Sequence, residues 1–180
     1  KQYDLKGDYI ANLRVAKPFP MGSVFSGLVE VRNSSIPSGA PLLTVGVPFV
    51  KDDLGKITHL AVADIRLDRI QRIFSTESDR TFFLVDKDGA VVAHPNDKLA
   101  LEGKKLKNLE IVEIALSSNV RQGEKPFVDP DTDERFVGAY AKTTFGVSVI
   151  AQVTEDIILG PAREVKREAF YITGMVLSGA

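Results

Sequence analysis

In the N-terminal part of the chain, three segments in which apolar and polar residues alternate are followed by one with helical spacing of apolar residues. Alternating apolar and polar residues, typical of strands, occupy 27–32, 41–50 and 56–64. The run Asp52-Asp53-Leu54-Gly55 separates the last two segments and is typical of a turn between antiparallel strands. Apolar residues at helical spacing follow between Leu67 and Phe74, so we expect a short helix to close this unit.

The pattern starts again after the polar stretch 75–80. Strands are predicted at 82–86, 90–94, 125–128, 135–141 and 146–153, and helices at 99–106 and 109–116. Asp88-Gly89 separates the first two of these strands and is the strongest short-range signal of a hairpin. This order of elements predicts one antiparallel sheet with helices crossing one face.

The first unit matches only the later part of this order, because a helical piece at 8–15 leads into three strands. We therefore expect its first two strands to precede residue 1. The predicted fold class is α+β. It comprises a partial module at 1–75, a complete module at 76–154, and an exit helix at 155–180 that begins after the capping residue Thr154.

The C-terminal end of the chain carries no charge. Glu168 is the last charged residue, and residues 169–180 are uncharged. A bilayer span needs about 20 residues, so this segment is interpreted as the first half of a membrane-spanning helix. The chain opens on polar residues with no leader-like apolar run, so either it is cytosolic or its targeting segment lies outside this sequence.

Composition narrows the classes of partner. The 180 residues are 44% hydrophobic and 26% charged, which is ordinary for a globular protein. The formal net charge of -1 argues against nucleic acid or anionic lipid as the main partner, since both require clustered positive charge. The absence of cysteine excludes disulfides, thiolate catalysis and Cys-ligated zinc.

Motifs for catalysis, metals and cofactors are missing. Neither glycine-rich nucleotide template occurs, and His59 and His94 are too far apart and too few for a metal set. Asp129, Asp131 and Asp133 alternate like calcium ligands, but the glycine and glutamate that such a loop needs are absent. We interpret this run as a hairpin loop and expect no metal and no cofactor.

Five segments of the sequence resemble the Cache family of extracytoplasmic sensor domains. The segment 82–96 carries an apolar strand, Asp-x-x-Gly, a second strand and a His-Pro pair, and 140–150 carries a Tyr strand, a turn with Gly and a further strand. Upstream, the segments at 8–13, 39–48 and 63–65 are similar to the later half of the membrane-distal module in double-Cache sensors.

The resemblance implies a PAS-like fold with a ligand cup in the distal module. It also implies a proximal module joined to a transmembrane helix, a periplasmic or extracellular location, and a homodimer that binds a small molecule. The effector beyond the membrane would be a chemoreceptor, histidine kinase or nucleotide cyclase region. The predicted function is therefore a sensor domain of a transmembrane receptor, with no catalytic residues of its own.

The resemblance also suggests ligand-binding residues. Asp64 matches the acid on the last distal strand of amino-acid sensors, and Tyr9 matches an aromatic residue of the same set. Lys6 stands where those sensors have an arginine, so the bidentate grip on a carboxylate is lost there. Asp64 either binds a cationic or amine group or satisfies backbone amides at its strand end.

In the proximal module, the polar residues predicted to point into the cup are His94, Arg135 and Tyr140. Surface strand positions remain the alternative for each of them. Two rival functions also stay open. An enzyme lacks its motifs in this sequence, whereas a ligand-free scaffold that dimerises and transmits movement is compatible with every pattern described so far.

Overall fold

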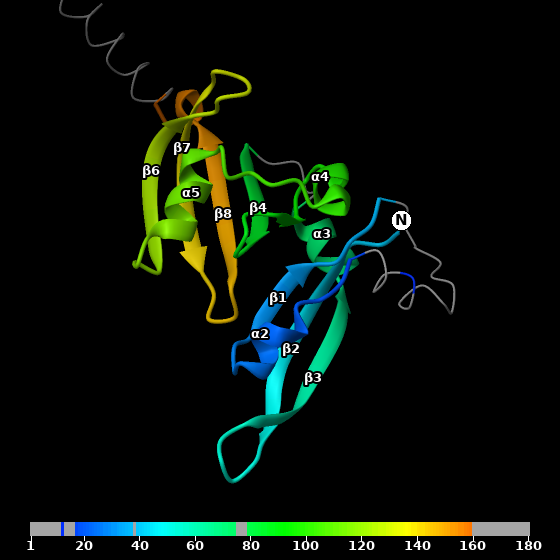
Figure 1. Ribbon diagram of the computed structural model, residues 1–180. Helices are drawn as coiled ribbons and strands as arrows, with labels where there is room; N and C mark the ends of the chain where they lie inside the picture. Colours follow the sequence, from blue (N-terminus) through cyan, green and yellow to red (C-terminus); the bar gives the residue numbers. More distant parts are fainter. Residues whose placement is uncertain (1–11, 13–16, 38, 75–78, 160–180) are drawn as a thin grey trace, which may run out of the picture.

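The computed structural model describes residues 12, 17–37, 39–74 and 79–159, which form two antiparallel sheets flanked by short helices (Figure 1). The first sheet has three strands in the order β1-β2-β3, and the second has five in the order β5-β4-β8-β7-β6. The mixed α+β architecture agrees with the predicted fold class. The helical piece expected at 8–15 lies outside the described residues, apart from Asn12.

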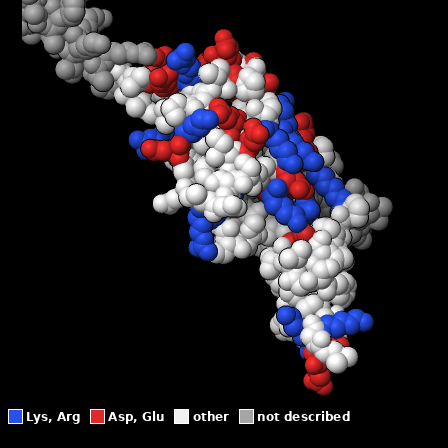
Figure 2. Space-filling view, turned by 60° about the vertical axis from the view of Figure 1, so that its left-hand side comes forward, with Lys and Arg blue, Asp and Glu red and all other residues white. Residues whose placement is uncertain are grey.

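The first sheet comprises β1 (Glu30–Asn33), β2 (Leu42–Lys51) and β3 (Ile57–Arg66). Asp52 fixes the turn between β2 and β3, since its Oδ1 accepts hydrogen bonds from the backbone N–H of Leu54 at 3.0 Å and Lys56 at 2.8 Å. The tip of this hairpin carries charges of both signs, whereas the sheet next to it is largely uncharged on the face seen in Figure 2.

One face of the first sheet is covered by α2 (Met21–Phe25) and the segment before it. Gly46 of β2 allows this close approach, because a Cβ atom there would lie 2.5 Å from the Phe19 ring and 3.0 Å from Val24. The helix α2 was not predicted. It has only five residues, and its N-cap is Pro20, whose side chain makes no capping hydrogen bond.

The second sheet comprises β4 (Arg80–Asp86), β5 (Val91–Ala93), β6 (Gln122–Val128), β7 (Arg135–Lys142) and β8 (Val147–Thr154). The helix α5 (Glu110–Ser117) contacts β6, β7 and β8, and α4 (Asp97–Glu102) contacts β5. Side chains from α5 and the sheet fill the space between them and form the largest core of buried residues, which includes Phe83, Ile111, Phe127, Tyr140 and Ile150. A helix on one face of this sheet is what the sequence predicted.

Helix α4 is shorter than the 99–106 predicted from apolar spacing. Its start is capped by the Asn96 side chain, which accepts from the backbone N–H of Lys98 at 3.1 Å. Gly103 then adopts a left-handed conformation with φ 62°, which ends the helix after Glu102. The predicted hairpin at Asp88-Gly89 forms between β4 and β5, and Gly89 takes the positive φ of 73° that such a turn needs.

The two sheets meet through a second core. Val31 and Leu43 of the first sheet pack with Val92 and Val147 of the second, and Leu67 lies between them at the start of α3 (Asp68–Phe74). Strand β1 also contacts β4 and β5. Buried apolar surface therefore joins the two sheets at this junction.

Beyond β8, residues 155–159 are helical, as expected for the exit helix. The predicted start of the membrane span at 169–180 lies outside the described residues. Within the part that the structure describes, no helix combines the length and apolar character needed to cross a membrane.

Candidate functional site

A row of polar side chains crosses the first sheet. Arg32 of β1 is opposite Thr44 of β2, and Thr44 is opposite Asp64 of β3, so the three lie on one face. Gly46, two residues from Thr44, faces Phe19 and Val24, which identifies this face as the one that α2 covers.

Hydrogen bonds fix the direction of the donors in this row. Thr44 is buried, and its Oγ1 lies 2.6 Å from Asp64 Oδ1 and 2.6 Å from Ser34 Oγ. An ionised carboxylate only accepts hydrogen bonds, so Thr44 donates to Asp64. Ser34 must then donate to Thr44, because the single Thr44 proton is already used. Any further group that meets Ser34 Oγ therefore has to be a donor.

A pocket of about 430 Å³ lies beside this row. We call it the junction pocket. Its lining residues are Lys17, Pro18, Phe19, Pro20, Arg32, Asn33 and Ser34. Its volume is in the range typical of small-molecule sites, and its wall combines an aromatic ring with two cations and a hydroxyl. Arg32 and Ser34 thus belong both to the pocket and to the polar row.

Ion pairs join the rim of the junction pocket to the turn between β4 and β5. Glu30 Oε1 accepts from Lys87 Nζ at 2.6 Å, and Glu30 Oε2 lies 3.4 Å from Arg32 Nε. Arg32 Nη1 in turn pairs with Asp88. Burial alone raises the pKa of Glu30, but hydrogen bonds from Lys87 and Ser23 and the nearby charges outweigh it, so this pKa lies below its usual value.

Asn33 makes the second link across the junction. Its Nδ2 donates to the backbone carbonyl of Ala100 at 2.7 Å and to that of Val91, while its Oδ1 accepts from Ser35 N at 2.7 Å. Its backbone N–H points to Asp86 Oδ2 at 3.4 Å. Burial raises the pKa of Asp86, although hydrogen bonds from backbone N–H groups oppose this rise.

Among the predicted proximal residues, His94 lies half-buried at the end of β5. Its ring centroid is 5.4 Å from that of Phe83, and its Nδ1 accepts from Asn96 N at 2.9 Å, which leaves the proton of the neutral ring on Nε2. Burial lowers the pKa of His94 to about 4. Gln71 of α3 holds its backbone, accepting from His94 N at 3.2 Å and donating to His94 O.

Tyr140 and Arg135 point in opposite directions from β7. Tyr140 is 6% exposed in the core, where its ring covers Gly123 of the neighbouring strand. The predicted inward orientation of Arg135 is wrong, because its side chain is 76% exposed and lies 3.9 Å from Glu155 at the surface. Binding by Asp64, His94 and Tyr140 remains a prediction, and Tyr9 lies outside the described residues.

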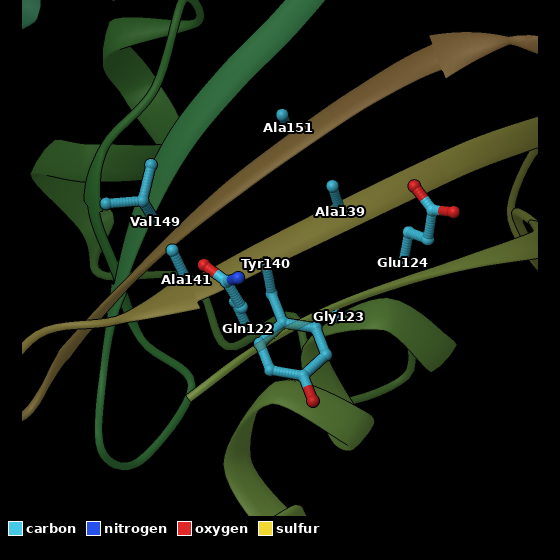
Figure 3. A pocket seen from close by; sticks show the side chains of 8 residues that line it. All are labelled: Gln122, Gly123, Glu124, Ala139, Tyr140, Ala141, Val149 and Ala151. Carbon is cyan, nitrogen blue, oxygen red and sulfur yellow. The ribbon is translucent and has the colours of Figure 1, made fainter. Parts of the chain in front are cut away.

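A second pocket, of about 450 Å³, opens on the face of the second sheet that α5 does not cover (Figure 3). Ala139, Ala141 and Ala151 form a shallow floor, and Gln122 and Glu124 of β6 also line the pocket. The Tyr140 ring points away from this pocket toward the helices. Among the described residues, no group of three or more His, Asp or Glu side chains is arranged to hold a metal ion.

Sequence reasoning missed Lys17, Arg32, Ser34 and Thr44. The signal for Thr44 was present, because it is a polar residue inside the apolar run 42–47. Lys17 and Arg32 carried no such signal, since charged residues in a loop or at a strand end are ordinary surface positions.

Comparison with known proteins gives the fold but no sequence family. No protein-family model matches the chain, and no curated protein matches it. The extracellular domain of the putative histidine kinase mmHK1S-Z2 has a TM-score of 0.59 at 19% identity, covering 77% of this chain and 55% of that domain. The corresponding domain of mmHK1S-Z3 has a TM-score of 0.57 at 21% identity, covering 76% and 52%.

A third solved structure covers almost the whole chain. It is the ligand-binding domain of the Pseudomonas aeruginosa PAO1 amino acid chemoreceptor PctB in complex with L-Arg. Its TM-score is 0.51 at 16% identity, and the match covers 93% of this chain and 65% of that domain. The chain spans about half the length of the two histidine kinase domains. It has the PAS-like α+β fold of extracellular sensor domains, which confirms the predicted fold class.

Proposed function

We propose that the chain is an extracellular sensor domain of a transmembrane receptor, of the double-Cache type, and that it binds a small molecule on the α2 face of the first sheet. The observation that carries this proposal is the hydrogen-bonded chain Asp64–Thr44–Ser34 beside the junction pocket, in which Thr44 and Ser34 are buried and Asp64 is half-buried. Hydroxyls held in one direction by a carboxylate are a ready-made polar anchor for a ligand. The similar solved structures are an extracellular domain of a histidine kinase and a ligand-binding domain of a chemoreceptor.

The strand order supports a division at about residue 75. In the second sheet the last three strands run β6-β7-β8, and β4 and β5 continue the sheet beyond β8. The first sheet has the same order for three strands, but no described strand lies beyond β3. We infer a partial distal module at 1–75 and a proximal module at 76–154. Residues 155–180 would then lead to the membrane in a homodimeric receptor.

A ligand-free scaffold is the second candidate, for one structural reason. In the proximal module, Phe127, Tyr140 and Ile111 occupy the space between α5 and the sheet, where a cup would have to open. The proximal module is therefore better suited to transmitting a movement than to binding a ligand. If the distal part also binds nothing, the whole chain would act only as a dimerising and transmitting element.

A thermal-shift screen of amino acids, carboxylates, amines, sugars and purines separates the two candidates. A ligand present at 100 times its dissociation constant stabilises the folded state by about 2.7 kcal/mol. Asp64→Ala should remove this stabilisation, because Thr44 and Ser34 lose their fixed direction. Asp53→Ala, at the exposed tip of the β2–β3 hairpin, is the matched control and should respond like the wild type. A flat response to every compound would favour the scaffold.

A further inference from the structure

We propose that Arg32 takes up a carboxylate of the ligand in the junction pocket and releases Asp88 in exchange, which loosens the contact between β1 and the β4–β5 turn. This inference rests on the proposed function and adds the ligand class and the route of the signal. Its starting point is the double position of Arg32, which lines the pocket and also pairs with Asp88 across the junction.

The charge of the pocket favours an anionic group. Lys17 and Arg32 are the two charged residues in its wall, and both are cations. The Lys17 amino group donates to the backbone carbonyl of Ser35, so its position is fixed. Burial lowers the pKa of Lys17, which means that a bound anion would also relieve the cost of keeping this amine charged.

The donors of Arg32 are already partly occupied. A carboxylate binds a guanidinium most strongly through two parallel hydrogen bonds, on the Nε–Nη2 edge or on the Nη1–Nη2 edge. Glu30 stands against Nε, and Asp88 against Nη1. Each edge therefore has one nitrogen that faces an acid. A bidentate ligand on either edge thus competes with one of these two carboxylates for Arg32.

Asp88 is the acid that can leave. The Glu30 side chain is 1% exposed and is also held by Lys87 at 2.6 Å, so releasing it would strand a buried charge. The Asp88 side chain is 42% exposed and is hydrated once it is free. Glu30 Oε2 is buried without a hydrogen bond in the described structure, which gives Arg32 an acceptor after it moves.

Releasing Asp88 changes the junction without opening it. Glu30–Lys87 and the hydrogen bonds of Asn33 to Val91 and Ala100 remain. The turn itself is held by Asp86, whose Oδ1 accepts from Asp88 N at 2.9 Å. The β4–β5 turn thus loses one of its ties to the first sheet, and the second sheet gains freedom to shift on the shared core.

The other end of the ligand follows from Ser34. Because Ser34 Oγ donates to Thr44, a ligand group that meets it must be a donor, which a hydroxyl or an ammonium group provides. The ligand class is therefore a small carboxylate that carries a hydroxyl or amino group. A carboxylate without such a donor should bind through Arg32 alone and more weakly.

The test measures binding of L-lactate, L-alanine, propionate and 1,2-propanediol to the 180-residue chain by NMR titration. We expect lactate or alanine to bind most tightly, propionate more weakly, and the diol not at all. Arg32→Gln should weaken carboxylate binding at least tenfold. Arg121→Gln, at an exposed position just before β6, is the control and should leave binding unchanged.

The variant Asp88→Asn tests whether the ligand displaces Asp88 from Arg32 or whether Asp88 only orients Arg32. If the ligand competes with Asp88, removing the Asp88 charge should tighten lactate binding several-fold; if Asp88 only orients Arg32, binding should weaken, which would overturn the proposal. This exposed substitution also keeps the test valid should Arg32→Gln fail to fold. A ligand of another class whose affinity is the same in Arg32→Gln would overturn the proposal and leave the sensor function standing. No binding by any compound in the broader screen would overturn both.

Discussion

Replacing Asn33 by alanine tests whether the junction between the two sheets holds the fold together. The side chain donates to two backbone carbonyls of the second sheet's unit, at Val91 and Ala100, and both residues are fully buried. Alanine would leave the Val91 carbonyl and the N–H of Ser35 without their side-chain partner, while the Ala100 carbonyl would keep its hydrogen bond from Gly103 N at 3.2 Å. Leaving one buried polar group unsatisfied costs about 1–3 kcal/mol.

Water can reach part of this site because Asn33 itself is only half-buried, so we expect a loss of about 2–4 kcal/mol in the free energy of unfolding. Asn33→Asp should be worse than alanine, since a carboxylate cannot donate to the two carbonyls and would add a negative charge near Asp86, which contacts the backbone N–H of the same residue. The assay is chemical denaturation followed by circular dichroism, with Asn108→Ala as an exposed control that should change stability by less than about 0.5 kcal/mol. A free energy for Asn33→Ala equal to that of the control would refute the reasoning.

Three further outcomes follow from single contacts. Because the pKa of His94 falls from 6.5 to about 4 on folding, stability should be lost as the pH drops from 6.5 toward 4, and His94→Gln should remove that part of the pH profile in urea titrations. Gly46→Ala should cost about 1–3 kcal/mol, since its Cβ would lie 2.5 Å from the Phe19 ring, whereas Gly22→Ala in open space on α2 should be neutral or stabilising in the same thermal melts. Gln71→Ala should speed hydrogen exchange of the His94 amide, whose acceptor it removes, and unchanged protection there would contradict the assigned hydrogen bond.

Local patterns predicted the strands of both sheets well. Asp88-Gly89 predicted the β4–β5 hairpin because the turn needs a positive φ, which glycine adopts easily, and Gly89 has it. The alternation of faces along β7 could also have corrected the predicted orientation of Arg135. Arg135 and Tyr140 are five positions apart, so they must lie on opposite faces of one strand, and they could not both point inward.

The junction could not be predicted from local patterns. Glu30 and Lys87 are separated by 57 positions, and the sequence near either residue gives no sign that the two form a pair. A buried glutamate looks like a surface residue in the sequence until its cationic partners are placed beside it. The junction pocket is lined by residues 17–20 and 32–34, which no local pattern showed to be neighbours, so Arg32 was overlooked while Asp64 was identified through resemblance.

The apolar core that the two sheets share also governs how the chain folds. Val92 and Val147 belong to the second sheet, yet they pack with Val31 and Leu43 of the first. A fragment cut at about residue 78 would expose this surface and would be prone to aggregate. The intact chain should therefore unfold in one cooperative transition, and neither half should serve alone as a folding unit. A chain built this way keeps its two halves in register from the moment it folds.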